Sequence, residues 1–165
     1  MSESSKQVII AAMREVARLL HDMLSSGIIC DYALFGAVAQ MRYAEAVSTM
    51  DADVLVAVPL RGFPVEGEAI RVGAWPVQFI PAFSPLTEEA MHEAQTAEIE
   101  GISIRVVGAD HLAVIALSVG RAKDYARILS LIESGSVSTE GLQRLAERHG
   151  LSAEWRRFHS RFLEH

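Results

Sequence analysis

Residues 49–58, TMDADVLVAV, decide the fold, because two aspartates lead directly into a continuous apolar run. Residues 54–58 contain no polar side chain, which is typical of a central strand covered on both faces. Asp51 and Asp53 are two positions apart, so their side chains leave such a strand on the same face, about 6.6 Å apart along it. Close carboxylates repel each other, and a hard divalent cation held by carboxylate oxygens relieves that repulsion. If both aspartates lie instead in a solvated turn before Val54, they have no role.

Upstream of this pair, residues 34–39 read LFGAVA. A strand over residues 32–35, Gly36 and a helix over residues 37–46 are expected here. Glycine at such a turn lets backbone N–H groups approach an anion, and the helix N-terminus adds a favourable partial charge. Glycine also serves many strand-to-helix turns through its backbone freedom alone. One strand–helix–strand unit would bring Gly36 and the acidic pair to the same edge of a sheet.

The rest of the chain predicts a sheet core followed by helices. We expect a single α+β domain over residues 1–165: a mixed β-sheet flanked by helices over residues 1–107, and a helical C-terminal cap over residues 108–165. Asp110 and Ser152 are expected to be N-caps, and Gly150 is expected to stop a helix. The other expected elements are a helix over 6–25 that Gly27 ends, strands over 69–75 and 77–80 joined through Pro76, a helix over 87–95, a strand over 102–107, and helices over 110–119, 123–134, 139–149 and 153–163.

Composition excludes several classes of protein. The 15 basic and 21 acidic residues give a net charge of −6, which argues against a broad nucleic-acid surface but allows a local phosphate pocket. The single cysteine, Cys30, excludes an intramolecular disulfide and is expected to be a small buried hydrophobe. The start, MSESSKQVII, lacks the features of a signal peptide, and no stretch approaches the roughly 20 apolar residues of a membrane span. A cytoplasmic location, with no membrane partner, is therefore expected.

Two segments together resemble the minimal nucleotidyltransferases, including the toxin type of some toxin–antitoxin systems. Residues 34–39 are similar to that family's glycine turn, and residues 49–56 to its Thr-x-Asp-x-Asp strand. The resemblance extends over about residues 30–155. Residues 101–107, followed by His111-Leu112, resemble the family's next strand. Residues 120–124 resemble its Arg-x-Lys-Asp helix junction, and residues 142–151 with Trp155 resemble its closing helices.

The resemblance implies a nucleotidyltransferase-like fold that binds a nucleoside triphosphate with Mg²⁺. An acceptor hydroxyl would attack the α-phosphorus, and pyrophosphate would leave. Asp51 and Asp53 would be the catalytic, metal-holding carboxylates, with Gln78 at the position of a third metal ligand. The nucleotide would be contacted by Gly36, Ala37, Thr49, Arg121 and Lys123. For Arg121 and Lys123 the alternative is a solvated helix start, in which Lys123 only balances Asp124.

Departures from the family pattern leave two main hypotheses open. Gln78 replaces a carboxylate, Ala37 a glycine or serine, and Ala116 a frequent lysine, while Val47 and Ser48 occupy a stretch that commonly holds an arginine. An active nucleotidyltransferase with an unknown acceptor is one hypothesis. A catalytically degenerate binding or regulatory protein, such as half of a toxin–antitoxin pair, is the other. A purely structural oligomeric domain is a third reading, and either a homo-oligomer or an antitoxin-type partner is compatible with the sequence. The six histidines form no metal-binding spacing such as HExxH and are assigned no role.

Overall fold

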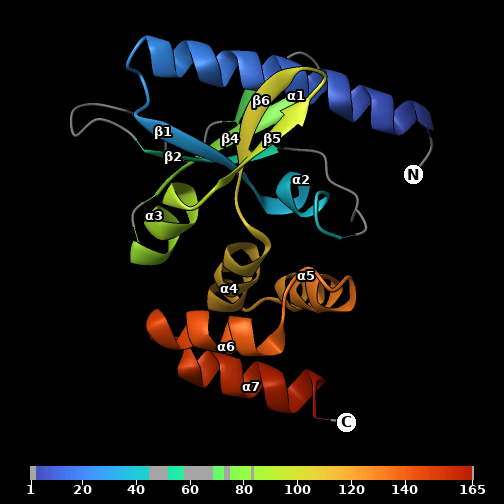
Figure 1. Ribbon diagram of the computed structural model, residues 1–165, viewed down its shortest axis with the longest axis vertical. Coiled ribbons are helices and arrows are strands. Elements are labelled where there is room, and N and C mark those ends of the chain that lie inside the picture. The colour runs from blue at the N-terminus through green and yellow to red at the C-terminus, as the bar shows by residue number, and fades with distance from the viewer. Residues whose placement is uncertain (1–2, 45–51, 58–68, 73–74, 83, 165) are drawn as a thin grey trace.

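The computed structural model describes residues 3–44, 52–57, 69–72, 75–82 and 84–164. Within them it contains one six-stranded sheet, flanked by helices (Figure 1). The strands are β1 (Asp31–Phe35), β2 (Ala52–Ala57), β3 (Ala69–Val72), β4 (Trp75–Pro81), β5 (Gln95–Ile99) and β6 (Ile102–Val106). The helices are α1 (Glu3–Ser25), α2 (Gly36–Gln40), α3 (Pro85–His92), α4 (Ala109–Val119), α5 (Ala122–Glu133), α6 (Thr139–Arg148) and α7 (Ser152–Phe162).

The sheet is mixed, as the sequence predicted, and its strand order is β3-β4-β2-β1-β6-β5. Strand β2 lies between β4, with which it is parallel, and β1, with which it is antiparallel. Val54, Leu55 and Val56 of β2 are at most 1 % exposed, so this strand is covered on both faces. The prediction of a doubly covered central strand is confirmed.

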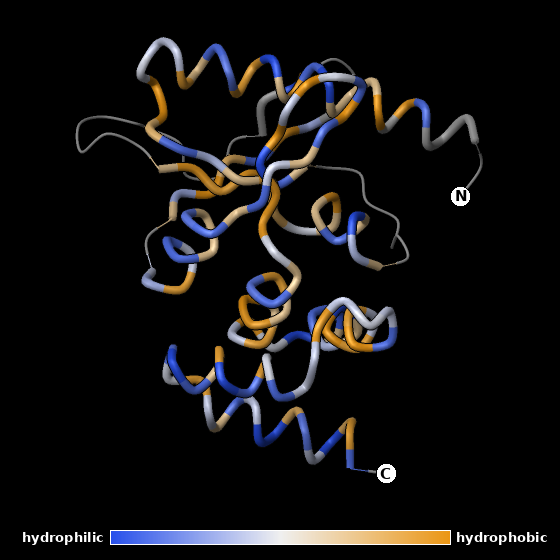
Figure 2. Tube along the Cα trace, in the orientation of Figure 1, coloured by the Kyte–Doolittle hydropathy of each residue, from blue (hydrophilic) through white to orange (hydrophobic). Residues whose placement is uncertain are grey.

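The helices form layers on the two faces of the sheet. Helix α1 lies across one face and contacts β3, β5 and β6, and its polar and apolar positions alternate along the helix (Figures 1 and 2). Met13, Val16 and Leu20 form its buried side, as expected of an amphipathic helix. On the other face, α2 and α3 contact the sheet and also α4, which links the sheet to the C-terminal helices.

Helix α4 is apolar around most of its circumference, because it is surrounded. It contacts α2, α3, α5, α6 and α7, and eight of its residues are buried. A helix that is hydrophobic on all sides belongs in the interior. Farther along, Tyr125 of α5 packs against Phe158 and Phe162 of α7, and Trp155 packs against Phe158. The aromatic residues of α7 therefore serve packing.

Several local predictions were wrong. The helix predicted over residues 37–46 ends at Gln40, and residues 41–44 form turns. Residues 45–46 of that prediction lie outside the described residues. Pro76 lies within β4 rather than between two strands, and Gln95 belongs to β5, a strand that was not predicted. Asp110 lies in the first turn of α4 and Ser152 is the first residue of α7, so neither is an N-cap. Gly27 and Gly150 do follow helix ends, each with positive φ.

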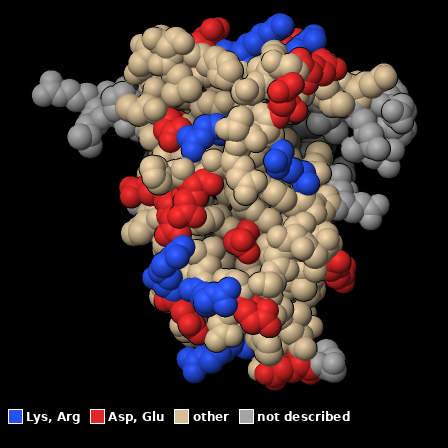
Figure 3. Space-filling model, viewed as in Figure 1, with Lys and Arg blue, Asp and Glu red and all other residues tan. Residues whose placement is uncertain are grey.

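Cys30 is exposed, contrary to the expectation that it is buried. Its neighbour Ile29 is 1 % exposed and takes the interior position, so the cysteine side chain is left outside. Among the described residues, no helix is both long and apolar enough to cross a membrane. On the face drawn in Figure 3, basic and acidic side chains are interspersed rather than gathered by sign.

Candidate functional site

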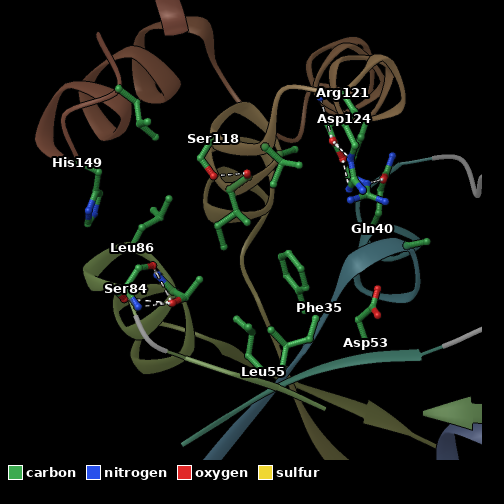
Figure 4. Close-up of a pocket in the computed structure, with 18 of the residues that line it drawn as sticks. Phe35, Gln40, Asp53, Leu55, Ser84, Leu86, Ser118, Arg121, Asp124 and His149 are labelled. Carbon is green, nitrogen blue, oxygen red and sulfur yellow. Dashed lines mark hydrogen bonds and ion pairs between the residues drawn. The ribbon is translucent and has the colours of Figure 1, made fainter. Parts of the chain in front are cut away.

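A pocket of about 1030 Å³ lies between the sheet and the C-terminal helices (Figure 4). The sheet contributes Phe35 of β1 and residues of β2 and β4, and α2 contributes Ala37 and Gln40. Helices α3, α4 and α5 and the segment joining α6 to α7 line the rest. The walls therefore come from distant parts of the sequence, on both sides of residue 107.

Asp53 and Gln78 lie side by side on the sheet wall. The register of the parallel strands pairs Asp53 of β2 with Gln78 of β4, and both half-buried side chains line the pocket. Residues opposite each other in neighbouring strands project to the same face. The structure thus brings together two of the three residues predicted to hold a metal. Asp51, the third, and Thr49 lie outside the described residues.

The turn at Gly36 lies directly against the Asp53 carboxylate. Gly36 has φ +64°, and a Cβ added to it would lie 2.2 Å from Asp53 Oδ2. Two separate features require glycine at this position: the left-handed backbone conformation and the close approach of the Asp53 carboxylate. Ala37, the next residue, lines the pocket, so the predicted phosphate turn and Asp53 share one corner of it.

Arg121 and Lys123 line the opposite wall, at the start of α5. The Nε of Arg121 donates a hydrogen bond to Oδ2 of Asp124 at 2.7 Å, and its backbone N–H donates to the same oxygen at 3.1 Å. Burial of Asp124 acts to raise the pKa of its carboxyl, but these hydrogen bonds and the charges of Arg121 and Arg127 outweigh burial and lower the pKa. Asp124 is thus balanced by Arg121, contrary to the alternative in which Lys123 balances it. Lys123 is exposed.

Two pocket residues were not predicted from the sequence, Gln40 and Arg127. The Nε of Arg127 donates to Oε1 of Gln40 at 2.8 Å, and Gln40 is only 1 % exposed. Nε2 of Gln40 is buried and has no hydrogen-bond partner within the described part of the chain. A buried donor without an acceptor is costly. No sequence motif marks either residue, because they meet only when α5 packs near α2.

The arrangement has two chemically different walls. The sheet wall carries the side-chain oxygens of Asp53 and Gln78, a donor set that suits a hard cation. The helical wall carries Arg121, Lys123 and Arg127, which suit an anion. Ala116 of α4, also in the lining, adds no charge where the family often has a lysine.

No protein-family model matches the sequence, and no curated protein matches it either. Among solved structures, the antibiotic-resistance factor ANT(2'')-Ia is similar, with a TM-score of 0.51 at 14% identity over 93% of this chain and 98% of that one. The chain has a nucleotidyltransferase-like fold. An antigenic nucleotidyltransferase-like protein from Paracoccidioides brasiliensis also matches, with a TM-score of 0.46 at 15% identity over 86% of this chain and 90% of that one. At such identities the likeness shows the fold and nothing finer.

Proposed function

We propose that this protein binds a nucleoside triphosphate with Mg²⁺ in the pocket and transfers a nucleotidyl group to an acceptor hydroxyl. The observation that carries the proposal is the corner formed by Gly36, Asp53 and Gln78 within a nucleotidyltransferase-like fold. The pocket volume, about 1030 Å³, is at the upper end of the range for small-molecule sites and leaves room for a nucleotide and an acceptor.

The residues present fit Mg²⁺, because carboxylate and carboxamide oxygens are the ligands that this ion takes. Asp53 and Gln78, with Asp51 as predicted, would hold it. When bound, Mg²⁺ supplies charge neutralisation of the phosphates and polarises the phosphorus under attack. The protein's own cations, Arg121 and Lys123, face the same space from the helical wall.

Each remaining polar group has a defined task in this proposal. Backbone N–H groups at Gly36 and Ala37 would bind phosphate oxygens, and the buried Nε2 of Gln40 would donate to the ligand. Gln78 can offer an oxygen to a metal but cannot accept a proton at neutral pH. Proton removal from the acceptor would therefore fall to a carboxylate, and Asp53 is the described candidate. We expect transfer to be slow for this reason.

The test is the melting temperature of the protein with Mg²⁺ and each of the four nucleoside triphosphates. A ligand at 100 times its Kd stabilises a protein by about 2.7 kcal/mol, which is roughly 5–11 °C for a chain of this size. Asp53→Asn should abolish the shift, while Asp22→Asn, an exposed change on α1, should keep it. The absence of a shift with all four nucleotides at millimolar concentration would contradict the proposal.

The catalytically degenerate alternative rests on Gln78 and Ala116 and predicts nucleotide binding without turnover. Release of pyrophosphate from a labelled triphosphate separates the two, since only the enzyme produces it. A role in a toxin–antitoxin pair, an antitoxin-type partner and a cytoplasmic location remain proposals from the sequence resemblance. Co-purification of a stoichiometric partner from the native host would support the paired role.

A further inference from the structure

A second cluster of polar side chains lies where α3, α4 and the end of α6 meet. Nε2 of His111 is 3.1 Å from Oε1 of Glu89 and 3.9 Å from Oε2 of Glu93, and Nε2 of His149 is 2.7 Å from Oε2 of Glu89. The side chains of both histidines are at most 10 % exposed. Arg148 also pairs with Glu89. Glu89, Glu93 and His111 do not line the pocket described above, whereas Arg148 and His149 do.

Glu89 is the centre of this cluster, because His111, His149 and Arg148 all pair with its carboxylate. Each Glu89 oxygen faces a different histidine: Oε1 faces His111 and Oε2 faces His149. A carboxylate held in place by a histidine on one oxygen is a preorganised metal ligand through the other.

We propose that Glu89, Glu93 and His111 bind a divalent transition-metal ion, for which Zn²⁺ is the probe, at a site separate from the predicted Mg²⁺ site. Their three ligand atoms lie within 4.8 Å of one another. Metal–ligand bonds of about 2.0–2.2 Å in tetrahedral geometry place ligand atoms roughly 3.3–3.6 Å apart. The separations from His111 Nε2, 3.1 Å and 3.9 Å, lie on either side of that value, so small side-chain adjustments would complete the geometry.

The donor set selects the class of metal. One imidazole nitrogen with two carboxylates suits zinc and its first-row neighbours, whereas Mg²⁺ favours oxygen ligands and keeps several waters. Three protein ligands leave a fourth position for water or another small ligand. His149, bonded to the second oxygen of Glu89, acts as a positioning residue.

The metal would join α3 to α4. Glu89 and Glu93 come from α3 and the residue after it, which pack against the sheet, while His111 comes from α4, the helix that links the sheet to the C-terminal helices. Arg148 opposes metal binding, because its positive charge shares Glu89. Its side chain is 58 % exposed and can turn into solvent.

The test is calorimetric titration of Zn²⁺ into tag-free, chelator-treated protein with millimolar Mg²⁺ present, so that the predicted Mg²⁺ site is occupied. We expect one Zn²⁺ per chain and a rise in melting temperature. Glu93→Gln should weaken binding at least ten-fold, and folding should survive because the Glu93 side chain is 56 % exposed. The matched control is Glu88→Gln, a change at an exposed glutamate of α3, which should leave the affinity unchanged. Equal affinities for these two variants, or no binding at micromolar Zn²⁺, would overturn the proposal.

Two further variants decide where the ion binds. Arg148→Gln should tighten Zn²⁺ binding, because it removes the competitor for Glu89. Weaker binding by this variant would mean that the cluster is an ion-pair network rather than a metal site. Asp53→Asn should bind Zn²⁺ like the wild type, and a loss there would move the ion to the predicted Mg²⁺ site and overturn the assignment. Because the readout is Zn²⁺ binding, the result stands whether or not a nucleotide binds.

Discussion

Replacing Gly36 by alanine tests the contact between the glycine turn and Asp53. Gly36 has φ +64°, and the left-handed conformation costs an L-residue about 1–2 kcal/mol. The new Cβ would in addition lie 2.2 Å from Oδ2 of Asp53, so the carboxylate must rotate away. We expect a loss of unfolding free energy of at least about 1–2 kcal/mol, or roughly 2–8 °C in melting temperature. Binding of the Mg²⁺–nucleotide complex should fall further, because Asp53 no longer faces the metal.

Gly27→Ala is the matched control. Gly27 has φ +74°, but nothing lies within 4 Å of the position its Cβ would take. This variant therefore carries the backbone cost without the displacement of Asp53. Denaturant unfolding measures the stability of both variants, and calorimetry with Mg²⁺ and the nucleotide that gives the largest thermal shift measures binding.

Equal affinities of Gly36→Ala and Gly27→Ala for that nucleotide would show that Asp53 does not depend on the glycine turn for its position. A double-mutant cycle with Asp53→Ala sharpens the comparison, since residues in contact show coupled effects on stability. Most of the clash should be relieved once Asp53 lacks its carboxylate, because only its Cβ, 3.2 Å from the added Cβ, remains close. Gly36→Ala should therefore cost less stability in that background. Additive losses would mean that the turn accommodates the new Cβ without moving Asp53.

Two further predictions concern the walls of the pocket. Gln78→Asp places a carboxylate beside Asp53 and should tighten Mg²⁺ binding and speed nucleotidyl transfer. The added negative charge should cost a small amount of stability. Titration of Mg²⁺ into wild type and variant measures the affinity, and an unchanged affinity would contradict this prediction. Asp124→Ala removes a buried carboxylate that accepts hydrogen bonds from Arg121, and should cost about 2 kcal/mol of unfolding free energy at pH 7. Because the folded-state pKa of Asp124 is lowered, its contribution is present above about pH 4 and is lost as the pH falls through the folded value. The difference between wild type and variant should therefore shrink in unfolding curves recorded below pH 4, and a constant difference would exclude a role for the charge.

The central strand and the helices could be predicted from the sequence because each carries its own periodic signal. The apolar run of β2 and the amphipathic pattern of α1 are local properties, and both elements are present. Strand β5 has no such signal, because Gln95–Ile99 contains only one β-branched apolar residue and lies exposed at the edge of the sheet. Its hairpin with β6 closes through Glu100 and Gly101, both with positive φ. A Glu-Gly pair is a weaker turn signal than Asn-Gly or Asp-Gly.

The residues of the candidate site also differ in how far they could be predicted from the sequence. Gly36 and Asp53 could be placed from the sequence because the turn and the strand that carry them have local signals. Gln78 was placed by the family resemblance, and its pairing with Asp53 comes from the register of β2 and β4. The contact between Gln40 and Arg127 joins residues 87 positions apart, and that between Glu89 and His149 joins residues 60 positions apart. Both arise from the packing of the C-terminal helices, which periodicity does not determine. The histidines were assigned no role because they lack a local metal spacing, yet His111 and His149 meet one glutamate in space.

The pocket requires both parts of the chain. The predicted oxygen ligands belong to β2 and β4, whereas Arg121, Lys123 and Arg127 belong to the N-cap and body of α5. Helix α4 packs against α2, α3 and α5. A metal-bound triphosphate presents a cation and several negative oxygens at once, so it complements the two walls only when they face each other. Changes that shift α4 should therefore weaken nucleotide binding even when no ligand-contacting side chain is altered.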